Sequence, residues 1–311
     1  MTRLFIVNPD SQTVKTKGSV LGRVEANGDT SIEFLDDFTI MPDIAARALA
    51  SDVRHVFIEG GDGTAHGVLT AFLALQDQYE TLPNFTLLAG GMTNQVARNI
   101  GIKSPSAQRV SSLLKNGPRK THQVPLLRID TGQASPAFGF LFSTGAIPSA
   151  TDYCTEQMHG RGVGGTAAVA ATILRGVAGS KAARDHMMPS TPLSLRIDRE
   201  HDQTRIDAPH LGTVVTTLPG LIMKLDPFWG QGSGALRLTY ASSDAGHLVR
   251  NLAGLWMGRK HISRAKDGIE SFNAHALHYD YNGPCVLDGE RIVTADGYID
   301  IRPTAPVTFV T

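Results

Sequence analysis

Cysteine is scarce in this sequence, and so is any excess of charge. The chain of 311 residues has only two cysteines, Cys154 and Cys285, and 29 basic residues balance 29 acidic ones. Two cysteines exclude a disulfide-rich scaffold and a cysteine-rich zinc site, and such low usage is typical of a reducing compartment. Without a net charge, no overall field attracts nucleic acid. We therefore expect a cytoplasmic protein with no nucleic-acid partner.

Long apolar runs are also missing. The first residues, MTRLFIVNPD, hold a four-residue apolar run that stops at Asn8-Pro9, which is too short for a signal peptide. The most apolar helix-like segment, residues 166–179, consists of small residues and is broken by Arg175. Neither segment can span a bilayer. Any membrane contact is expected to be peripheral, at the inner membrane surface.

The first part of the chain alternates between strand-like and helix-like segments. Buried-strand patterns occupy residues 3–8, 53–60 and 85–91, and helix patterns occupy residues 41–50, 65–76 and 93–101. Such alternation favours a parallel sheet with helices on its faces. The sequence thus predicts an α/β, Rossmann-like domain over residues 1–124.

From about residue 125 the pattern changes to short alternating segments separated by Gly, Pro, Asp and Ser. This pattern predicts a β-rich, antiparallel, sandwich-like domain over residues 125–311, with helical insertions near 151–180 and 244–257. The C-terminal segment is free to pack back on the first domain. An enzyme of this organisation is expected to hold its site in the cleft between the domains, and a homo-oligomer is left open.

Glycines cluster where the second predicted strand meets a helix. Gly60, Gly61, Asp62, Gly63 and Thr64 form the sequence GGDGT. A glycine turn at a helix N-terminus exposes backbone N–H groups and a partial positive charge, which favours a phosphate. A carboxylate at this position is suited to binding Mg²⁺ or to activating a nearby hydroxyl group. The alternative is a tight turn with an aspartate cap.

Two further turns are predicted at the same sheet edge. The third strand ends in Gly90-Gly91, followed by Thr93 and Asn94, and the first strand ends in Asn8-Pro9. Ligands bind outside the carboxyl ends of parallel strands. Three such turns together favour a nucleotide site.

Four motifs occur in a recognisable order: IVNP at 6–9, GGDGT at 60–64, GG-x-TN-x-x-A at 90–97 and VLDGE at 286–290. In this order they resemble the diacylglycerol kinase catalytic-domain family, which includes bacterial lipid kinases and sphingosine kinases and is related to NAD kinases. The resemblance covers nearly the whole chain. It implies an ATP-dependent, Mg²⁺-dependent kinase that phosphorylates a lipid hydroxyl.

The resemblance also implies roles for single residues. Residues 60–64 match the ATP-phosphate loop, and the other nucleotide contacts would be Asn8, Thr39, Gly91, Thr93 and Asn94. The catalytic residues would be Glu290, Asp288 and Asp62. Glu290 or Asp288 would act as general base, and Asp62 and Asp288 would hold the catalytic Mg²⁺. The alternative for Asp288-Gly289-Glu290 is a hairpin turn with solvated acids.

The sequence departs from the family pattern at several places. Ala65-His66-Gly67 replaces the usual Leu-Asn-Glu, and Met92 takes a usual Thr position. Many bacterial members hold a structural Mg²⁺ in a loop that matches residues 218–238 here. Asp226 is retained, but Ser233 stands where an aspartate is expected. The resemblance therefore implies that this structural metal is lost.

Other patterns are weaker. GRGVGG at 160–165 fits a dinucleotide fingerprint but lacks the preceding strand. His275 and His278 with Asp280 suggest metal ligands, but residues i and i+3 of a strand face opposite sides. Two rival functions remain: a kinase of a soluble hydroxyl compound such as NAD or a sugar, and a nucleotide-binding protein without turnover.

Overall fold

The computed structural model describes residues 3–25, 28–79, 81–90, 95–146, 148, 189–220, 226–248, 250–251 and 264–311. The chain divides into two compact units. The first unit consists of Met1–Pro125 together with Ala305–Thr311, and the second unit is Leu126–Thr304. The second unit is therefore an insertion into the first.

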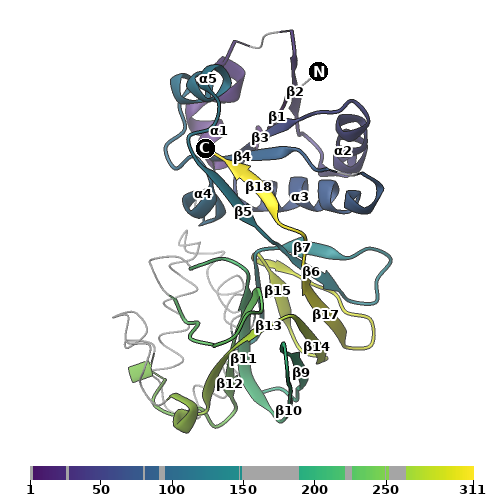
Figure 1. Ribbon diagram of the computed structural model, residues 1–311, viewed down its shortest axis with the longest axis vertical. Helices are drawn as coiled ribbons and strands as arrows, with labels where there is room; N and C mark the ends of the chain where they lie inside the picture. The colour runs from purple at the N-terminus through teal and green to yellow at the C-terminus, as the bar shows by residue number, and fades with distance from the viewer. Residues whose placement is uncertain are drawn as a thin grey trace, which may run out of the picture. The chain divides into compact units, whose positions relative to one another are not determined.

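One six-stranded sheet forms the centre of the first unit (Figure 1). Its order is β2-β1-β3-β4-β18-β5. Pairing is parallel throughout except between β18 and β5. The strands are β1 (Arg3–Val7), β2 (Thr30–Phe34), β3 (His55–Gly60), β4 (Asn84–Ala89), β5 (Thr121–Val124) and β18 (Val307–Val310).

Helices cover both faces of this sheet. Phe5, Val7 and Phe57 form one core cluster with Val14, Val110 and other side chains of α1, η1 and α5. Leu4, Ile6, Val56 and Ile58, which alternate with Phe5, Val7 and Phe57, are buried as well. In Figure 1, α2 and α3 lie together, apart from α1 and α5. The helices are α1 (Gln12–Lys17), η1 (Leu21–Arg23), η2 (Phe38–Ile40), α2 (Met41–Ala50), α3 (Asp62–Leu73), η3 (Gln76–Gln78), α4 (Gln95–Ile100) and α5 (Ala107–Asn116).

Local sequence explains where these helices begin and end. Pro42 stands in the first turn of α2, where its missing N–H costs nothing. The Ser106 hydroxyl accepts from the N–H of Arg109 and caps α5, which ends at Gly117 with a positive φ of 77°. The predicted α/β domain with a parallel sheet is therefore confirmed.

The second unit contains two six-stranded antiparallel sheets, in the orders β10-β9-β14-β17-β6-β7 and β13-β12-β11-β8-β15-β16. Its core cluster includes Ile129 and Leu277 from one sheet and Phe142 and Leu238 from the other, so the sheets pack as a sandwich. The elements are β6 (Leu127–Asp130), β7 (Ala137–Gly139), β8 (Leu141–Gly145), β9 (Ser194–Asp198), β10 (Gln203–Asp207), β11 (His210–Thr216), β12 (Leu236–Ser242), η5 (Arg264–Asp267), β13 (Ile269–Ala274), β14 (Ala276–Asp280), β15 (Cys285–Leu287), β16 (Glu290–Arg291) and β17 (Tyr298–Pro303).

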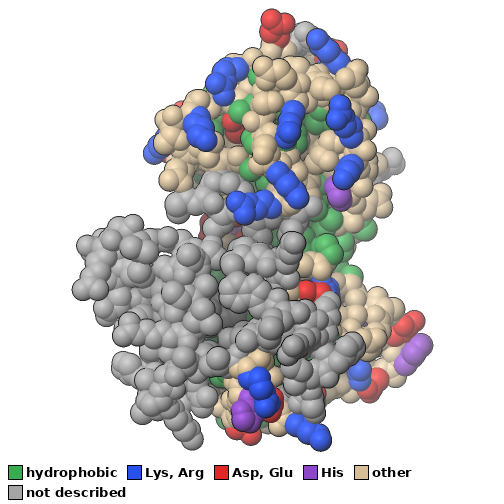
Figure 2. Space-filling view, turned by 90° about the vertical axis from the view of Figure 1, so that its left-hand side faces the viewer, with side chains coloured by type: hydrophobic (Ala, Val, Ile, Leu, Met, Phe, Trp, Pro, Cys, Tyr) green, Lys and Arg blue, Asp and Glu red, His purple; other side chains and the backbone are tan. Residues whose placement is uncertain are grey.

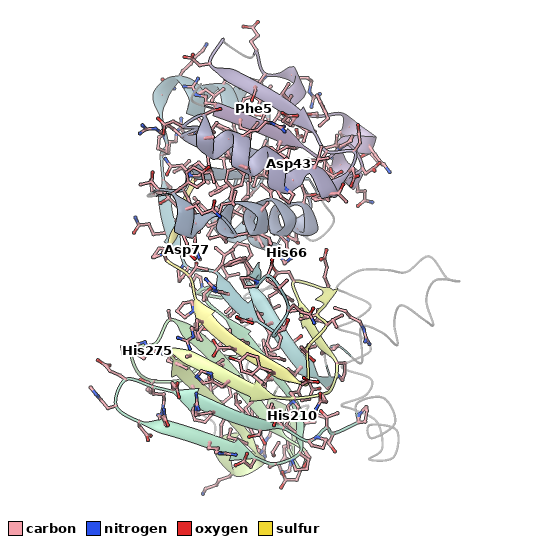
Figure 3. All side chains as sticks on the ribbon, turned by 90° about the vertical axis from the view of Figure 1, so that its right-hand side faces the viewer. Phe5, Asp43, His66, Asp77, His210 and His275 are labelled. Carbon is pink, nitrogen blue, oxygen red and sulfur yellow. The ribbon has the colours of Figure 1, made fainter. Side chains whose placement is uncertain are left out.

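A buried hydrogen-bond network crosses this sandwich near His210 (Figure 3). The Nε2 atom of His210 lies 2.8 Å from the Thr144 hydroxyl, which in turn lies 2.8 Å from the Thr213 hydroxyl. The Thr213 hydroxyl continues to the hydroxyl of Tyr279 at 3.2 Å. Burial lowers the pKa of His210 and raises that of Tyr279, because it disfavours the charged form of each group.

Some predictions fall outside the described residues. The helical insertion at 151–180, with the GRGVGG sequence, lies there entirely, and half of the insertion at 244–257 does too. Among the residues that the structure describes, no helix has the length and apolar character needed to cross a membrane.

Candidate functional site

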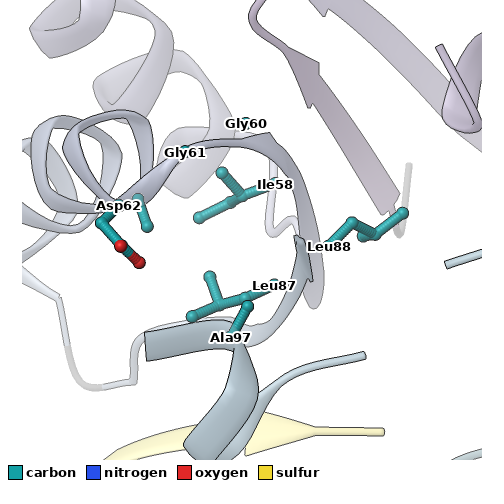
Figure 4. Close-up of a pocket in the computed structure, with 8 residues that line it drawn as sticks. Ile58, Gly60, Gly61, Asp62, Leu87, Leu88 and Ala97 are labelled. Carbon is teal, nitrogen blue, oxygen red and sulfur yellow. The ribbon is translucent and has the colours of Figure 1, made fainter. Parts of the chain in front are cut away.

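The turn between β3 and α3 presents an open helix N-terminus (Figure 4). Gly61 is the N-cap residue, in an extended conformation, and no side chain caps the helix. The twelve-residue α3 therefore begins without a cap from the side chain of its N-cap residue, and its dipole places a partial positive charge there. This arrangement is suited to an anion such as a phosphate.

Asn8 and Thr64 brace this turn from within the protein. The Asn8 side-chain amide donates to the Thr64 hydroxyl at 2.8 Å, and its carbonyl oxygen accepts from the N–H of Asp10. Thr64 is buried. A Cβ atom on Gly60 would lie 2.5 Å from the Thr64 side chain, so only glycine fits beside it. These side chains hold the turn in shape.

The turn after β4 is fastened to the same place. The N–H of Gly90 donates to the Gly60 carbonyl at 2.9 Å, and the Gly90 carbonyl accepts from the N–H of Thr13 in α1. The structure thereby brings Asn8, Gly60 and Gly90 together at the carboxyl edge of the sheet. The predicted contacts Gly91, Thr93 and Asn94, and the unusual Met92, lie outside the described residues.

Asp62 connects α3 to α4. Its Oδ1 atom accepts from the N–H of Val96 at 3.2 Å, in the first turn of α4. The carboxylate thus lies between two helix N-termini, where its charge is stabilised. Its proposed roles toward metal and hydroxyl stay predictions.

A small pocket of about 10 Å³ lies beside this turn, lined by Ile58, Leu87 and Ala97 as well as by the glycines (Figure 4). Such a volume accommodates about one water molecule. A nucleotide cannot enter this pocket.

Thr39 lies on an exposed 3₁₀ turn, η2. Its N–H and hydroxyl donate to the Asp37 carboxylate at 2.8 and 2.6 Å, and these bonds lower the pKa of Asp37. Phe38, which precedes Thr39, explains part of the difference between Ala65-His66-Gly67 and the usual Leu-Asn-Glu of the family. A Cβ atom on Gly67 would come within 3.1 Å of the Phe38 ring, so the glycine leaves room for this side chain. Figure 3 marks His66 on the same helix.

Glu59 was not singled out by the sequence, although it directly precedes the glycine turn. Only 2% of its surface is exposed. Its carboxylate accepts from the Ser19 hydroxyl at 2.6 Å and from the N–H groups of Val20 and Leu21 at 2.7 and 2.9 Å. The glutamate anchors η1 to β3. The sequence signal that could have identified Glu59 is a charged residue at the end of an otherwise apolar strand.

In the second unit, Asp288 and Gly289 form the tight turn of the β15–β16 hairpin. Leu287 faces Glu290, and both turn residues have a positive φ, 51° for Asp288 and 96° for Gly289. This is the geometry that favours Asp-Gly in two-residue hairpins. The alternative interpretation of this motif as a hairpin turn is thus correct for its backbone.

The Asp288 carboxylate is bound to the backbone between β7 and β8. The N–H of Phe140 donates to both of its oxygens at 3.0 and 3.2 Å, and the N–H of Leu141 donates to Oδ1 at 2.9 Å. A Cβ atom on Gly139 would lie 2.5 Å from Oδ2, so this glycine permits the approach. Glu290, two residues on, is exposed. The contacts give Asp288 an anchoring role and leave Glu290 at the surface.

The two histidines near Asp280 do not converge on one site. His278 lies between two carboxylates, with Nε2 2.9 Å from Asp198 and Nδ1 2.6 Å from Asp300. His275 instead lies 3.5 Å from the Ser233 hydroxyl. Within the described part of the chain, no group of three or more His, Cys, Asp or Glu side chains is arranged to hold a metal ion.

Comparisons with known proteins find a family model that resembles the first part of the chain. Residues 2–126 match the family model described as the diacylglycerol kinase catalytic domain. A search of curated proteins gave no match.

Solved structures share the whole fold. A diacylglycerol kinase from Bacillus anthracis str. Sterne aligns with a TM-score of 0.60 at 14% identity, covering 99% of this chain and 96% of its own. A structure of a candidate diacylglycerol kinase from the same organism aligns with a TM-score of 0.69 at 15% identity and the same coverage. An NAD kinase from Archaeoglobus fulgidus, solved with ATP, reaches a TM-score of only 0.46 at 13% identity, and we draw no conclusion from it.

At such identities these structures establish the fold, while the family model matches the first unit. Residues 2–126 therefore match the model of the diacylglycerol kinase catalytic domain, and the whole chain has the two-domain fold of the solved Bacillus anthracis structures.

Proposed function

We propose that this chain is an ATP-dependent kinase that transfers the γ-phosphoryl group to a lipid hydroxyl. The observation that carries the proposal is the uncapped N-terminus of α3 behind the Gly60-Gly61 turn, in a domain that matches the diacylglycerol kinase model. Helix N-termini of this kind bind phosphates, and phosphoryl transfer depends mainly on positioning and charge stabilisation.

The turn would bind the ATP phosphates through its backbone. The bond from Asn8 to Thr64 and the bond from Gly90 to Gly60 hold the turn in shape before any ligand arrives. Mg²⁺, when bound, neutralises phosphate charge, and it commonly takes one or two carboxylates together with the phosphates. Asp62 is the carboxylate in the turn itself, and its position supports a role in holding the ion.

Glu290 would accept the proton of the attacking hydroxyl. It is exposed at the start of β16, whereas the Asp288 carboxylate already accepts from Phe140 and Leu141. A general base must reach the hydroxyl that it deprotonates. We therefore assign the base to Glu290 and a positioning role to Asp288.

The decisive test supplies γ-labelled ATP, Mg²⁺ and a total lipid extract to the full chain. We expect label in an organic-phase product, and we expect the Glu290→Gln variant to lose at least about 100-fold in rate, as removal of a general base does. Glu270→Gln, a change at another exposed glutamate of the same sheet, is the matched control and should keep full activity.

Two results would contradict the proposal. Label that appears only in aqueous products would identify a soluble acceptor, such as NAD or a sugar. ATP binding without any transfer, identical in wild type and Glu290→Gln, would identify a nucleotide-binding protein without turnover.

We further propose that the first unit contacts an anionic membrane surface. The faces of α1, η1, α5 and residues 117–120 carry seven exposed basic side chains, and residues 11–24 and 107–120 contain no Asp or Glu. We call this surface the basic face (Figure 2). Each such residue near an anionic bilayer contributes about 1 kcal/mol of binding. Its residues are Lys15, Lys17, Arg23, Arg109, Lys115, Arg119 and Lys120.

A further inference from the structure

Arg237, in β12, is bonded to the segment that joins β11 to β12. Its Nη1 atom donates to the carbonyl oxygen of Leu218 at 3.0 Å. Its Nη2 atom donates to Asp226 Oδ1 at 2.8 Å and to the carbonyl oxygen of Phe228 at 3.4 Å. One guanidinium therefore bonds two backbone carbonyls and one carboxylate, from the start and the middle of the segment.

The surroundings hold this arrangement in place. The side chains of Arg237 and Asp226 are only 20% and 23% exposed. The guanidinium carbon lies 4.9 Å from the centre of the Phe228 ring, and Phe228 is buried. The Thr239 hydroxyl, two residues along β12, donates to the Pro227 carbonyl. The contacts fix residues 226–228 against the strand.

These oxygens are the kind that a hard divalent cation would need. Mg²⁺ and Ca²⁺ bind carboxylates and backbone carbonyls. In this chain those acceptors already face a permanent positive charge, because arginine does not lose its proton in proteins. A cation at the same place would be repelled by the guanidinium and would have to displace its hydrogen bonds.

The second carboxylate expected for a structural metal is also missing. Ser233 stands at that position, and its hydroxyl bonds the Glu200 carboxylate instead. The described residues of this segment therefore do not fit the structural Mg²⁺ that many bacterial members of the family hold in the matching loop.

We propose that Arg237 replaces a divalent cation in this chain, fastening Leu218 and residues 226–228 to β12. The segment then keeps its position at any metal concentration. This inference is independent of the proposed phosphoryl transfer, because it concerns only the architecture of the second unit.

Thermal unfolding of the full chain, without nucleotide, tests the inference. We expect the same melting temperature in excess EDTA, in millimolar Mg²⁺ and in millimolar Ca²⁺. A fall in EDTA that either cation restores would overturn the proposal.

Variants test the role of the guanidinium itself. Arg237→Lys keeps the charge but cannot bond three acceptors as the planar guanidinium does, and we expect its melting temperature to fall by about 3–10 °C. Arg237→Ala should fall further, or fail to fold. Arg205→Ala removes an exposed arginine that pairs with Asp207 on its own strand, and it should change nothing. A lysine variant as stable as wild type would refute the role of Arg237.

Discussion

Gly60 shows how little space the turn between β3 and α3 leaves. A methyl group at this position would meet the Thr64 side chain at 2.5 Å, a distance that real Cβ atoms essentially never show. Thr64 is itself held by Asn8 at 2.8 Å, so it cannot turn away without losing that bond. Any side chain at position 60 must therefore distort the start of α3.

We predict that Gly60→Ala lowers the free energy of unfolding by about 1–3 kcal/mol, as overpacking does, and weakens ATP binding. Denaturant unfolding and a nucleotide titration measure both effects. Gly28→Ala is the control, since a Cβ atom there has nothing within 4 Å. Equal stability of the two variants would show that the turn yields more easily than its contacts indicate.

Asp288 and Glu290 differ in their surroundings. The Asp288 carboxylate is hydrogen-bonded to the backbone, whereas Glu290 is exposed. We predict that Asp288→Asn costs about 1–2 kcal/mol of folding free energy, because an amide replaces an acceptor of the Phe140 and Leu141 N–H groups. Asparagine tolerates the positive φ, so backbone strain does not confuse the result. Glu290→Gln should stay within about 0.5 kcal/mol of wild type. Chemical denaturation compares them, and the opposite order would reverse the two roles.

At the scale of elements, His55 links three strands of the first sheet. Its Nε2 atom lies 2.8 Å from the Thr86 hydroxyl, which donates to the Val310 carbonyl of β18. Burial lowers the pKa of His55 from 6.5 to about 4, with a smaller contribution from the charge of Arg3. Protonation of His55 is therefore less favourable in the folded chain than in the unfolded chain.

The sign of the pH dependence follows from this difference. Between pH 6.5 and about 4, unfolded His55 is protonated while folded His55 is neutral, so the free energy of unfolding falls as pH falls. The loss reaches at most about 1.4 kcal/mol for each pH unit. We predict that His55→Gln flattens the stability curve in this window, measured by denaturant unfolding at several pH values. His210 adds a slope of the same sign to the stability curves of the wild type and of His55→Gln. Parallel stability curves for the two proteins would contradict the prediction.

Elements with strong local signals could be predicted from the sequence. The parallel strands and the β3–α3 turn follow from apolar runs, helix periodicity and glycine chemistry, all of which are local. The partners of Glu59 and Arg237 could not be predicted, because each depends on contacts between segments distant in the sequence. Glu59 reaches Ser19, and Asp288 reaches Phe140. The hairpin at Asp288-Gly289 was visible locally, but the bonds that occupy its carboxylate were not.

The balanced composition of the whole molecule conceals an uneven distribution of charge. The net charge is zero, yet the basic face gathers seven exposed basic residues without an acidic residue in its two main stretches. Such a surface attracts anionic bilayers through a field that salt screens within about 10 Å at 0.1 M ionic strength.

We predict that the protein sediments with vesicles containing phosphatidylglycerol but not with pure phosphatidylcholine vesicles, and that high salt releases it. Changing Lys115, Arg119 and Lys120 to Glu should weaken binding by about 100-fold or more, at about 1 kcal/mol for each lost charge. The same change at Arg47, Arg54 and Arg205 is the control. Equal binding by both triple variants would show that another surface makes the contact.

The place of β18 has a consequence for how the protein is made. This strand, residues 307–310, lies between β4 and β5 in the first sheet, although it is synthesised after the entire second unit. A ribosome that has delivered residues 1–125 has therefore produced a sheet in which β5 still lacks its neighbour. The buried edge of β4 must wait unpaired through the translation of about 180 further residues, on the order of 10–40 s at usual elongation rates. During that interval the nascent first unit exposes an open strand edge, the kind of surface that chaperones protect and that neighbouring chains can pair with.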